Sequence, residues 1–331
     1  MGVERTDPYK GMFQKNRFLK KKTNHKVMQN NNLTSSCVLT ADIGGSHLTL
    51  GICHLSAYTI IDNTTTRVEF DSKGSATEIL KVWADAFQKV LKKKASLPIS
   101  GLSVAMPGPF DYQKGISYIK GLDKYEALYG MNIRNCFSDI LKLDPGMIRF
   151  RNDAESTIAG EVLTGAGMDC KRVLGITLGT GFGSAFCEKN ITRDINLGSE
   201  FYKDSIADDY LSTRWFLNRY YELTGMVLVG GVKELAELAS KNAVARDIFK
   251  EFAFNMSDFL SPPVKRLEPE VLIICGNIAK ASEFFLPYLT GELNTLPHRL
   301  AQLGENAPLI GAAAMFDNIT RPTSFDSVNQ L

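Results

Sequence analysis

The chain has 331 residues, of which 44% are hydrophobic and 22% charged, a composition typical of a water-soluble globular protein whose length fits two domains better than one. A net charge of +2 gives no electrostatic reason to expect a nucleic-acid or an acidic partner. No long apolar segment predicts a transmembrane helix, and the first residues lack the apolar stretch of a secretory signal, so we expect no membrane association.

Residues 1–36 differ in composition from the rest of the chain. They are rich in Lys, Arg and Asn, and they contain the runs Lys20–Lys22 and Asn30–Asn32. This composition favours a mobile or loosely attached extension. A short basic run is usually solvated, and no helix-turn-helix pattern accompanies this one, so we expect no nucleic-acid binding.

From Cys37 onward, strands and amphipathic helices alternate. The predicted strands cover residues 37–43, 47–55, about 60–70, 99–106, 147–151, 172–177, 184–188 and 271–275. The predicted helices cover residues 77–94, 133–141, 154–163, 278–289 and 309–316. A hairpin with a glycine-rich bend occurs twice, and strand–helix units follow each time. This repetition predicts two similar α/β domains facing one cleft.

The first glycine-rich bend lies in the stretch TADIGGSH, residues 40–47. A tight hairpin turn, in which Gly-Gly supplies positive φ, explains the glycines. It does not explain Asp42, a carboxylate near the end of an apolar strand. A glycine turn also leaves backbone N–H groups uncovered, which suits an anionic oxygen, and Mg²⁺ could stand between a carboxylate and a phosphate. Taken alone, the stretch leaves both interpretations open.

Three further segments have a structural and a functional interpretation. Gly179–Gly183 (GTGFG) lacks the spacing of a dinucleotide fingerprint, but with the first bend it could grip a polyphosphate. Helix capping explains Asn152 and Asp153, whereas the alternative makes Asp153 a general base and Asn152 a substrate contact. Gly276 and Asn277 follow an apolar strand, either as a plain connection or where the backbone approaches adenine.

The order of these motifs, namely DIGGS, ND before a small-residue helix, GTGFG and CGN, resembles the sugar-kinase, hexokinase and actin-like ATPase superfamily. Within it, the chain resembles the ROK family of bacterial sugar kinases and repressors, over about residues 37–317. The resemblance implies two actin-like, ribonuclease H-like domains around a central cleft. The smaller would comprise residues 37–151 plus about 306–320, and the larger residues 152–305.

The resemblance implies ATP-dependent phosphorylation of a hexose or N-acetylhexosamine hydroxyl, with Asp153 as the general base. Asn152 would bind the sugar, and Asp42 would face Mg²⁺ through water. The other implied sugar contacts are Pro107, Gly108, Glu200 and Asp208. The implied contacts to ATP are Gly44, Gly45, Ser46, Gly179, Thr180, Gly181, Gly183, Gly276 and Asn277. A homodimer is also implied.

The sequence departs from the family pattern in one respect that matters. Many members carry a CxCGxxGC zinc site and a partner histidine, and no Cys lies between Cys187 and Cys275 here. We therefore expect no zinc, and we expect other residues to bind the far side of the sugar. The six cysteines lack CxxC spacing and several lie in apolar runs, which indicates free thiols in a reducing cytoplasm.

Two rival functions stay open beside the kinase. A sugar-responsive ROK-type transcriptional regulator would need a DNA-binding domain, for which residues 1–36 are too short and too polar. A non-catalytic sugar-binding protein would not need Asp42, Asp153 and both glycine turns.

Overall fold

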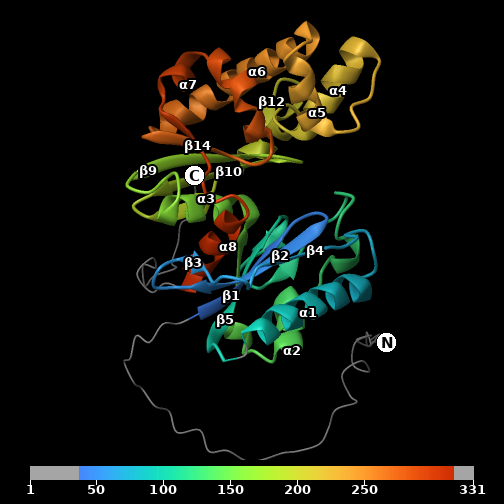
Figure 1. Cartoon of the computed structure of the whole chain (residues 1–331), viewed down its shortest axis with the longest axis vertical. Coiled ribbons are helices and arrows are strands. Elements are labelled where there is room, and N and C mark those ends of the chain that lie inside the picture. Colours follow the sequence, from blue (N-terminus) through green and yellow to red (C-terminus); the bar gives the residue numbers. More distant parts are fainter. Residues whose placement is uncertain (1–36, 95, 317–331) are drawn as a thin grey trace, which may run out of the picture. The chain divides into compact units, whose positions relative to one another are not determined.

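The computed structural model describes residues 37–94 and 96–316. The predicted N-terminal extension, residues 1–36, and the end of the smaller predicted domain, residues 317–320, lie outside these ranges. Two mixed β-sheets and the helices packed on them make up the described chain (Figure 1).

The first sheet has the strand order β3-β2-β1-β5-β8, and β4 also pairs with β2. Its strands are β1 Cys37–Ile43, β2 His47–His54, β3 Thr59–Ile60, β4 Thr66–Glu69, β5 Ile99–Met106 and β8 Ile148–Asn152. β1 is antiparallel to β2 and parallel to β5, which is parallel to β8. The carboxyl ends of β1, β5 and β8 therefore share one edge. The single strand expected at 60–70 is wrong: Asn63, at φ 61°, turns the chain between β3 and β4.

The second sheet repeats this arrangement with the order β11-β10-β9-β14-β15. Its strands are β9 Arg172–Leu178, β10 Phe182–Glu188, β11 Ile191–Asp194, β14 Val271–Cys275 and β15 His298–Leu300. β9 is antiparallel to β10 and parallel to β14, as β1 is to β2 and β5. The predicted repetition of a glycine hairpin before strand–helix units is confirmed. Two small hairpins complete the strands: β6 Phe110–Asp111 with β7 Ile116–Ser117, and β12 Phe201–Tyr202 with β13 Ser205–Ile206.

Different helices cover the outer faces of the two sheets. On the first sheet they are α1 Ala76–Lys93 and α2 Ile133–Leu141. On the second they include α4 Thr213–Thr224, α5 Gly231–Ala239, α6 Ala243–Leu267 and α7 Gly291–Thr295. α1 begins with a capping box, in which Ser75 accepts from the N–H of Glu78 and the Glu78 carboxylate accepts from the N–H of Ser75. None of the helices in the described ranges has the length and apolar character that a membrane span requires.

Several short 3₁₀ segments link these elements. They are η1 Glu126–Leu128, η2 Pro145–Met147, η3 Leu197–Ser199, η4 Ala207–Asp209, η5 Ile278–Phe284, η6 Leu286–Tyr288 and η7 Ala314–Phe316. The α-helix predicted over residues 278–289 is wrong, because η5 and η6 replace it. Ala281 departs from helical geometry, and Pro287 has no N–H to continue an α-helical ladder.

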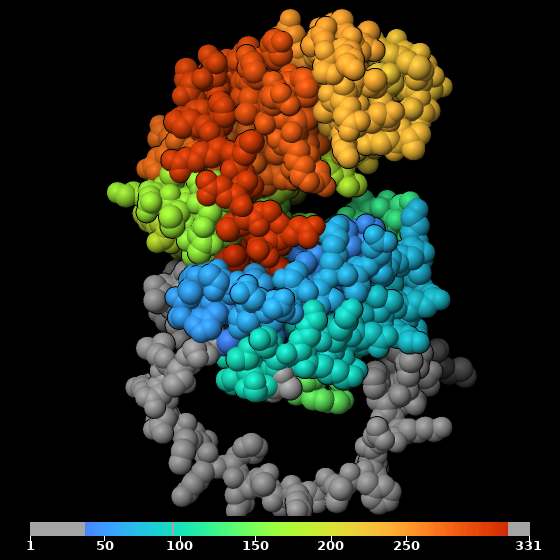
Figure 2. All heavy atoms as spheres, in the orientation of Figure 1, coloured from blue at the N-terminus to red at the C-terminus, as the bar shows by residue number. Residues whose placement is uncertain are grey.

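Helices α3 (Asp153–Thr164) and α8 (Asn306–Ala313) pack against each other, α3 against the second sheet and α8 against the first (Figure 1). Two glycines permit their backbone contact: a Cβ at Gly160 would lie 2.1 Å from the carbonyl oxygen of Ala307, and a Cβ at Gly311 would lie 1.8 Å from that of Ser156. In Figure 2 the red atoms of the last described residues lie against the blue atoms of the first sheet. The last described α-helix, α8, therefore returns to β1 and β5. The predicted domain boundaries stay a prediction.

All six cysteines are free thiols, as expected, and Cys37, Cys53, Cys187 and Cys275 are buried.

Candidate active site

The first glycine turn joins β1 to β2, where Ile43 pairs with Leu48 and the N–H of Gly44 donates to the carbonyl oxygen of His47 at 2.9 Å. Neither Gly44 nor Gly45 has a φ in the left-handed region, so the expectation that these glycines supply positive φ is wrong. A Cβ at Gly45 would meet only the Cδ of Lys124, at 3.9 Å. Gly45 and Ser46 are exposed, so the turn presents an unobstructed backbone at the carboxyl end of β1.

Asp42 and Asp153 lie close enough together that their charges interact. Burial, and after it the charge of Asp153, raise the pKa of Asp42 to about 7, while the Arg67 guanidinium opposes the rise. Burial also raises the pKa of Asp153, against the effect of its hydrogen bond from the N–H of Ala154 and the charge of Lys124. The structure therefore brings together the two carboxylates that the sequence singled out.

Asn152 serves as the N-cap of α3. Its Oδ1 accepts from the N–H of Glu155 at 3.0 Å, which confirms the capping interpretation of this side chain. Its Nδ2 donates to the hydroxyl of Tyr112 at 3.3 Å. That hydroxyl lies 3.5 Å from the position of a Cβ at Gly108, so Tyr112 links Asn152 to the Pro107–Gly108 loop. The cap occupies one acceptor and leaves the amide group beside that loop.

The second glycine turn joins β9 to β10, and its N–H and carbonyl groups are partly engaged by its surroundings. The N–H of Gly179 donates to the carbonyl oxygen of Gly181 at 3.0 Å, and the carbonyl oxygen of Gly179 accepts from the N–H of Thr213 at 2.8 Å. Thr180 and Gly181 are exposed. As in the first turn, the exposed backbone lies at the carboxyl end of a central strand.

Two other glycines are required by close packing around this turn. A Cβ at Gly183 would lie 2.5 Å from the Cβ of Ala154, so Gly183 lets β10 approach the first turn of α3 beside Asp153. Gly276 has a φ of 90°, and a Cβ there would lie 2.2 Å from the carbonyl oxygen of Leu178. Gly276 and the exposed Asn277 thus lie next to the root of the second glycine turn.

The two acidic residues proposed as sugar contacts differ in their surroundings. Asp208 accepts hydrogen bonds from the N–H of Phe182 and, at 2.7 Å, from the Nη2 of Arg214. Its carboxylate therefore supports the second glycine turn. Glu200 is exposed and follows η3, and its backbone carbonyl accepts from the N–H of Ala207 at 2.9 Å. Among the described residues, no hydrogen bond or ion pair joins Glu200 to Asp153.

Several residues near Asp153 were not predicted from the sequence. Tyr112 contacts Asn152, and Lys124 lies beside the first glycine turn, where its charge lowers the pKa of Asp153. Asp194, at the end of β11, has a pKa raised to about 6, first by burial and then by the charges of Glu155 and Asp153. Only the position of Tyr112, shortly after Pro107–Pro109, gave any local signal.

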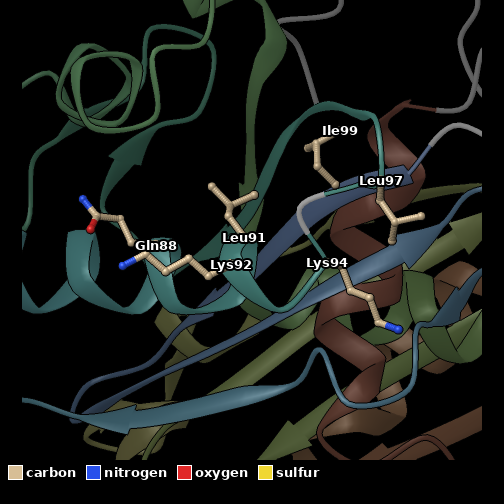
Figure 3. Close-up of a pocket in the computed structure, with 6 residues that line it drawn as sticks. All are labelled: Gln88, Leu91, Lys92, Lys94, Leu97 and Ile99. Atoms are coloured by element: carbon tan, nitrogen blue, oxygen red, sulfur yellow. The ribbon is translucent and has the colours of Figure 1, made fainter.

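The described residues contain no group of three or more His, Cys, Asp and Glu side chains placed to hold a metal ion. A surface pocket lies away from both glycine turns, at the end of α1 (Figure 3). It is lined by Gln88, Leu91, Lys92, Lys94, Leu97 and Ile99. None of these residues belongs to the candidate site.

Comparisons with solved structures show the fold. The ROK hexokinase of Thermus thermophilus matches with a TM-score of 0.68 at 18% identity, covering 84% of this chain and 96% of its own. The ROK family glucokinase of Streptomyces griseus, solved with glucose and AMPPNP, matches with a TM-score of 0.68 at 20% identity. The match covers 85% of this chain and 99% of the glucokinase chain. A ROK family transcriptional regulator, a homologue of the E. coli MLC protein, matches with a TM-score of 0.70 at 15% identity. The match covers 86% of this chain and 78% of the regulator chain. The predicted α/β fold of two actin-like ATPase domains is confirmed.

The sequence itself was compared with curated proteins and with protein families. No curated protein matches the chain, whereas the ROK family model matches residues 38–194. This segment holds Asp42, Asp153 and both glycine turns. The part of the chain that is similar to the ROK family is therefore the part that contains the candidate site.

Proposed function

We propose that the chain is a sugar kinase that transfers a phosphoryl group from ATP to a hydroxyl of a hexose or N-acetylhexosamine. The observation that carries the proposal is the convergence of two carboxylates and two glycine turns. Asp42 precedes the first turn and interacts with Asp153, while Gly183 of the second hairpin packs beside Asp153 against Ala154. Exposed backbone N–H groups for phosphate and a carboxylate for the acceptor hydroxyl thus meet in one region.

In this proposal Asp153 orients the acceptor hydroxyl and takes its proton as the bond to phosphorus forms. A pKa raised by burial keeps the carboxylate a better proton acceptor than an exposed aspartate. The glycine turns hold the phosphates by backbone N–H groups, so catalysis consists mainly of positioning and electrostatic stabilisation. Gly276 and Asn277 flank the adenosine, and Asn152, Gly108 and Glu200 contact the sugar.

The donor set fits Mg²⁺ held through Asp42. Mg²⁺ commonly keeps several waters and binds one or two carboxylates together with substrate phosphates, and Asp42 is a half-buried carboxylate beside the first turn. The ion would neutralise phosphate charge, and it would also lower the raised pKa of Asp42.

The similarity to the Streptomyces griseus glucokinase, solved with glucose and AMPPNP, supports a sugar acceptor and a nucleotide donor. A second candidate, a sugar-responsive regulator, is favoured by the similarity to the ROK family transcriptional regulator. The predicted homodimer, the cytoplasmic location and the absence of zinc stay predictions.

A screen of ATP consumption by the purified full chain, with Mg²⁺ and a panel of hexoses and N-acetylhexosamines, tests the proposal. We expect ADP formation that depends on at least one sugar and yields the sugar phosphate. Sugar binding without ADP formation would contradict the kinase and favour a regulator or a non-catalytic sugar-binding protein.

A further inference from the structure

Lys124 lies beside the first glycine turn, in a loop that has no role in the function proposed above. Its side chain is half-buried, and its Cδ lies 3.9 Å from the position of a Cβ at Gly45. Its charge lowers the pKa of Asp153. The side chain therefore lies beside the turn, near enough to Asp153 for its charge to act on that carboxylate. No hydrogen bond or ion pair within residues 37–94 and 96–316 engages its Nζ.

The residues on both sides of Lys124 are held in place. Tyr125 is fully buried, packs against the ring of Trp83 with centroids 6.0 Å apart, and donates its hydroxyl hydrogen bond to the carbonyl oxygen of Gly44. Asp123 forms an ion pair with Lys73. The loop is therefore attached to the same turn that Lys124 overlies.

The backbone on both sides of Lys124 is strained. Asp123 has a φ of 55° and Tyr125 a φ of 57°, in the left-handed region that non-glycine residues rarely adopt. Such a conformation is unfavourable for a non-glycine residue and persists only where the surrounding structure maintains it. The left-handed conformation of Asp123 and Tyr125 sets the course of the backbone on both sides of Lys124.

We propose that the ammonium group of Lys124 contacts the phosphoryl group in transfer, between the first glycine turn and Asp153. This inference rests on the proposed function, in which the turn binds phosphate and Asp153 binds the acceptor hydroxyl. The bond from the γ-phosphorus to the bridging oxygen of ATP breaks, the bond from the acceptor oxygen to phosphorus forms, and the acceptor proton moves to Asp153. Lys124 stays protonated and neutralises charge on the transferred oxygens.

The test compares K124M with K124R and with K120M. Lys120 lies in the same loop, is exposed, and has its Nζ 5.2 Å from the centroid of the Tyr129 ring, so K120M is a matched control. We expect K124M to lower kcat by about 10² to 10³-fold with little change in the KM for sugar. K124R should recover part of kcat, and K120M should keep it. Thermal unfolding of each variant verifies folding.

Nucleotide binding separates this inference from the proposed function. The affinities for AMPPNP and ADP are measured for each protein, and we expect K124M to weaken AMPPNP binding by about tenfold more than ADP binding. If the wild type phosphorylates no sugar but K124M loses the preference for AMPPNP, the kinase fails and the Lys124 contact stands. An active wild type whose kcat and nucleotide preference survive in K124M overturns the contact. A wild type that binds neither nucleotide overturns both.

Discussion

The charges of Asp42 and Asp153 interact, although the strand that contains Asp42 and the strand that precedes Asp153 are not neighbours in the sheet. Asp42 lies in β1, Asp153 follows β8, and β5 lies between these strands in the sheet. Because the three strands are parallel, their carboxyl ends meet at one edge, and there the charge of Asp153 adds to burial in raising the pKa of Asp42 to about 7. The topology thus concentrates negative charge where the proposed phosphate and sugar meet.

The raised pKa of Asp42 predicts a pH-dependent stability in metal-free protein. The folded value of about 7 lies above the usual 3.8, so the folded chain binds this proton more tightly than the unfolded chain. The resulting stabilisation is complete below about pH 4 and is lost as the pH rises through 7. Urea unfolding in EDTA at pH 5.5 and 8.5 measures it. We expect the wild type to lose about 2 kcal/mol more than D42N over this interval. Equal losses would contradict the assigned pKa.

Glycines with open space around them and glycines in close backbone contact should respond differently to substitution by alanine. G45A meets no close atom and no left-handed backbone, so its Tm should stay near that of the wild type. If the bare turn binds phosphate, the added methyl group should still weaken ATP binding by about tenfold. Calorimetric titration with ATP measures this affinity.

G160A provides the contrast. Its Cβ would lie 2.1 Å from the carbonyl oxygen of Ala307, at the contact of α3 with α8, so we expect a loss of about 1 to 3 kcal/mol in unfolding free energy. A G45A variant that binds ATP normally would remove the first turn from the proposed site.

We predict that a substitution of Glu161 lowers the stability of the fold, because its contacts are structural. This side chain is fully buried in α3, and its carboxylate accepts hydrogen bonds from the N–H groups of Ala166, Gln302 and Leu303. In E161Q an amide NH₂ would face these donors, so we expect a loss of about 2 to 4 kcal/mol in urea unfolding. In the native protein the Glu237 carboxylate makes, among the described residues, only an exposed ion pair with Lys233, so E237Q should lose less than about 0.5 kcal/mol. Equal losses would show that the buried contacts contribute little.

The sequence predicted the parts of the fold that local signals determine. Apolar runs and glycine bends mark both hairpins, so β1 and β14 match their predicted ranges and the repeated topology was foreseen. No helix or strand was predicted within residues 201–270, where α4, α5 and α6 lie. α6 even contains Pro262 and Pro263, a pair that normally ends a helix.

Only those residues of the candidate site that belong to a local sequence motif could be predicted. Asp42, Asp153 and the glycine turns follow from local patterns. The hydrogen bond from Tyr125 to Gly44 joins residues 81 positions apart, and it places Lys124 only after the chain has folded. The attachment of Asp208 to the N–H of Phe182 likewise depends on the tertiary approach of η4 to β10.

The kinetics of D153N test the central claim most directly. Once a sugar substrate is found, kcat and the dissociation constants for sugar and ATP are measured for the wild type, D153N and D194N. Asp194 is the matched control, because its carboxylate interacts with Asp153 but has no proposed part in proton transfer. We predict that D153N loses about 10³-fold or more in kcat while both dissociation constants stay within a few-fold, and that D194N loses far less. Near-normal turnover in D153N would contradict the assignment of Asp153 as the general base.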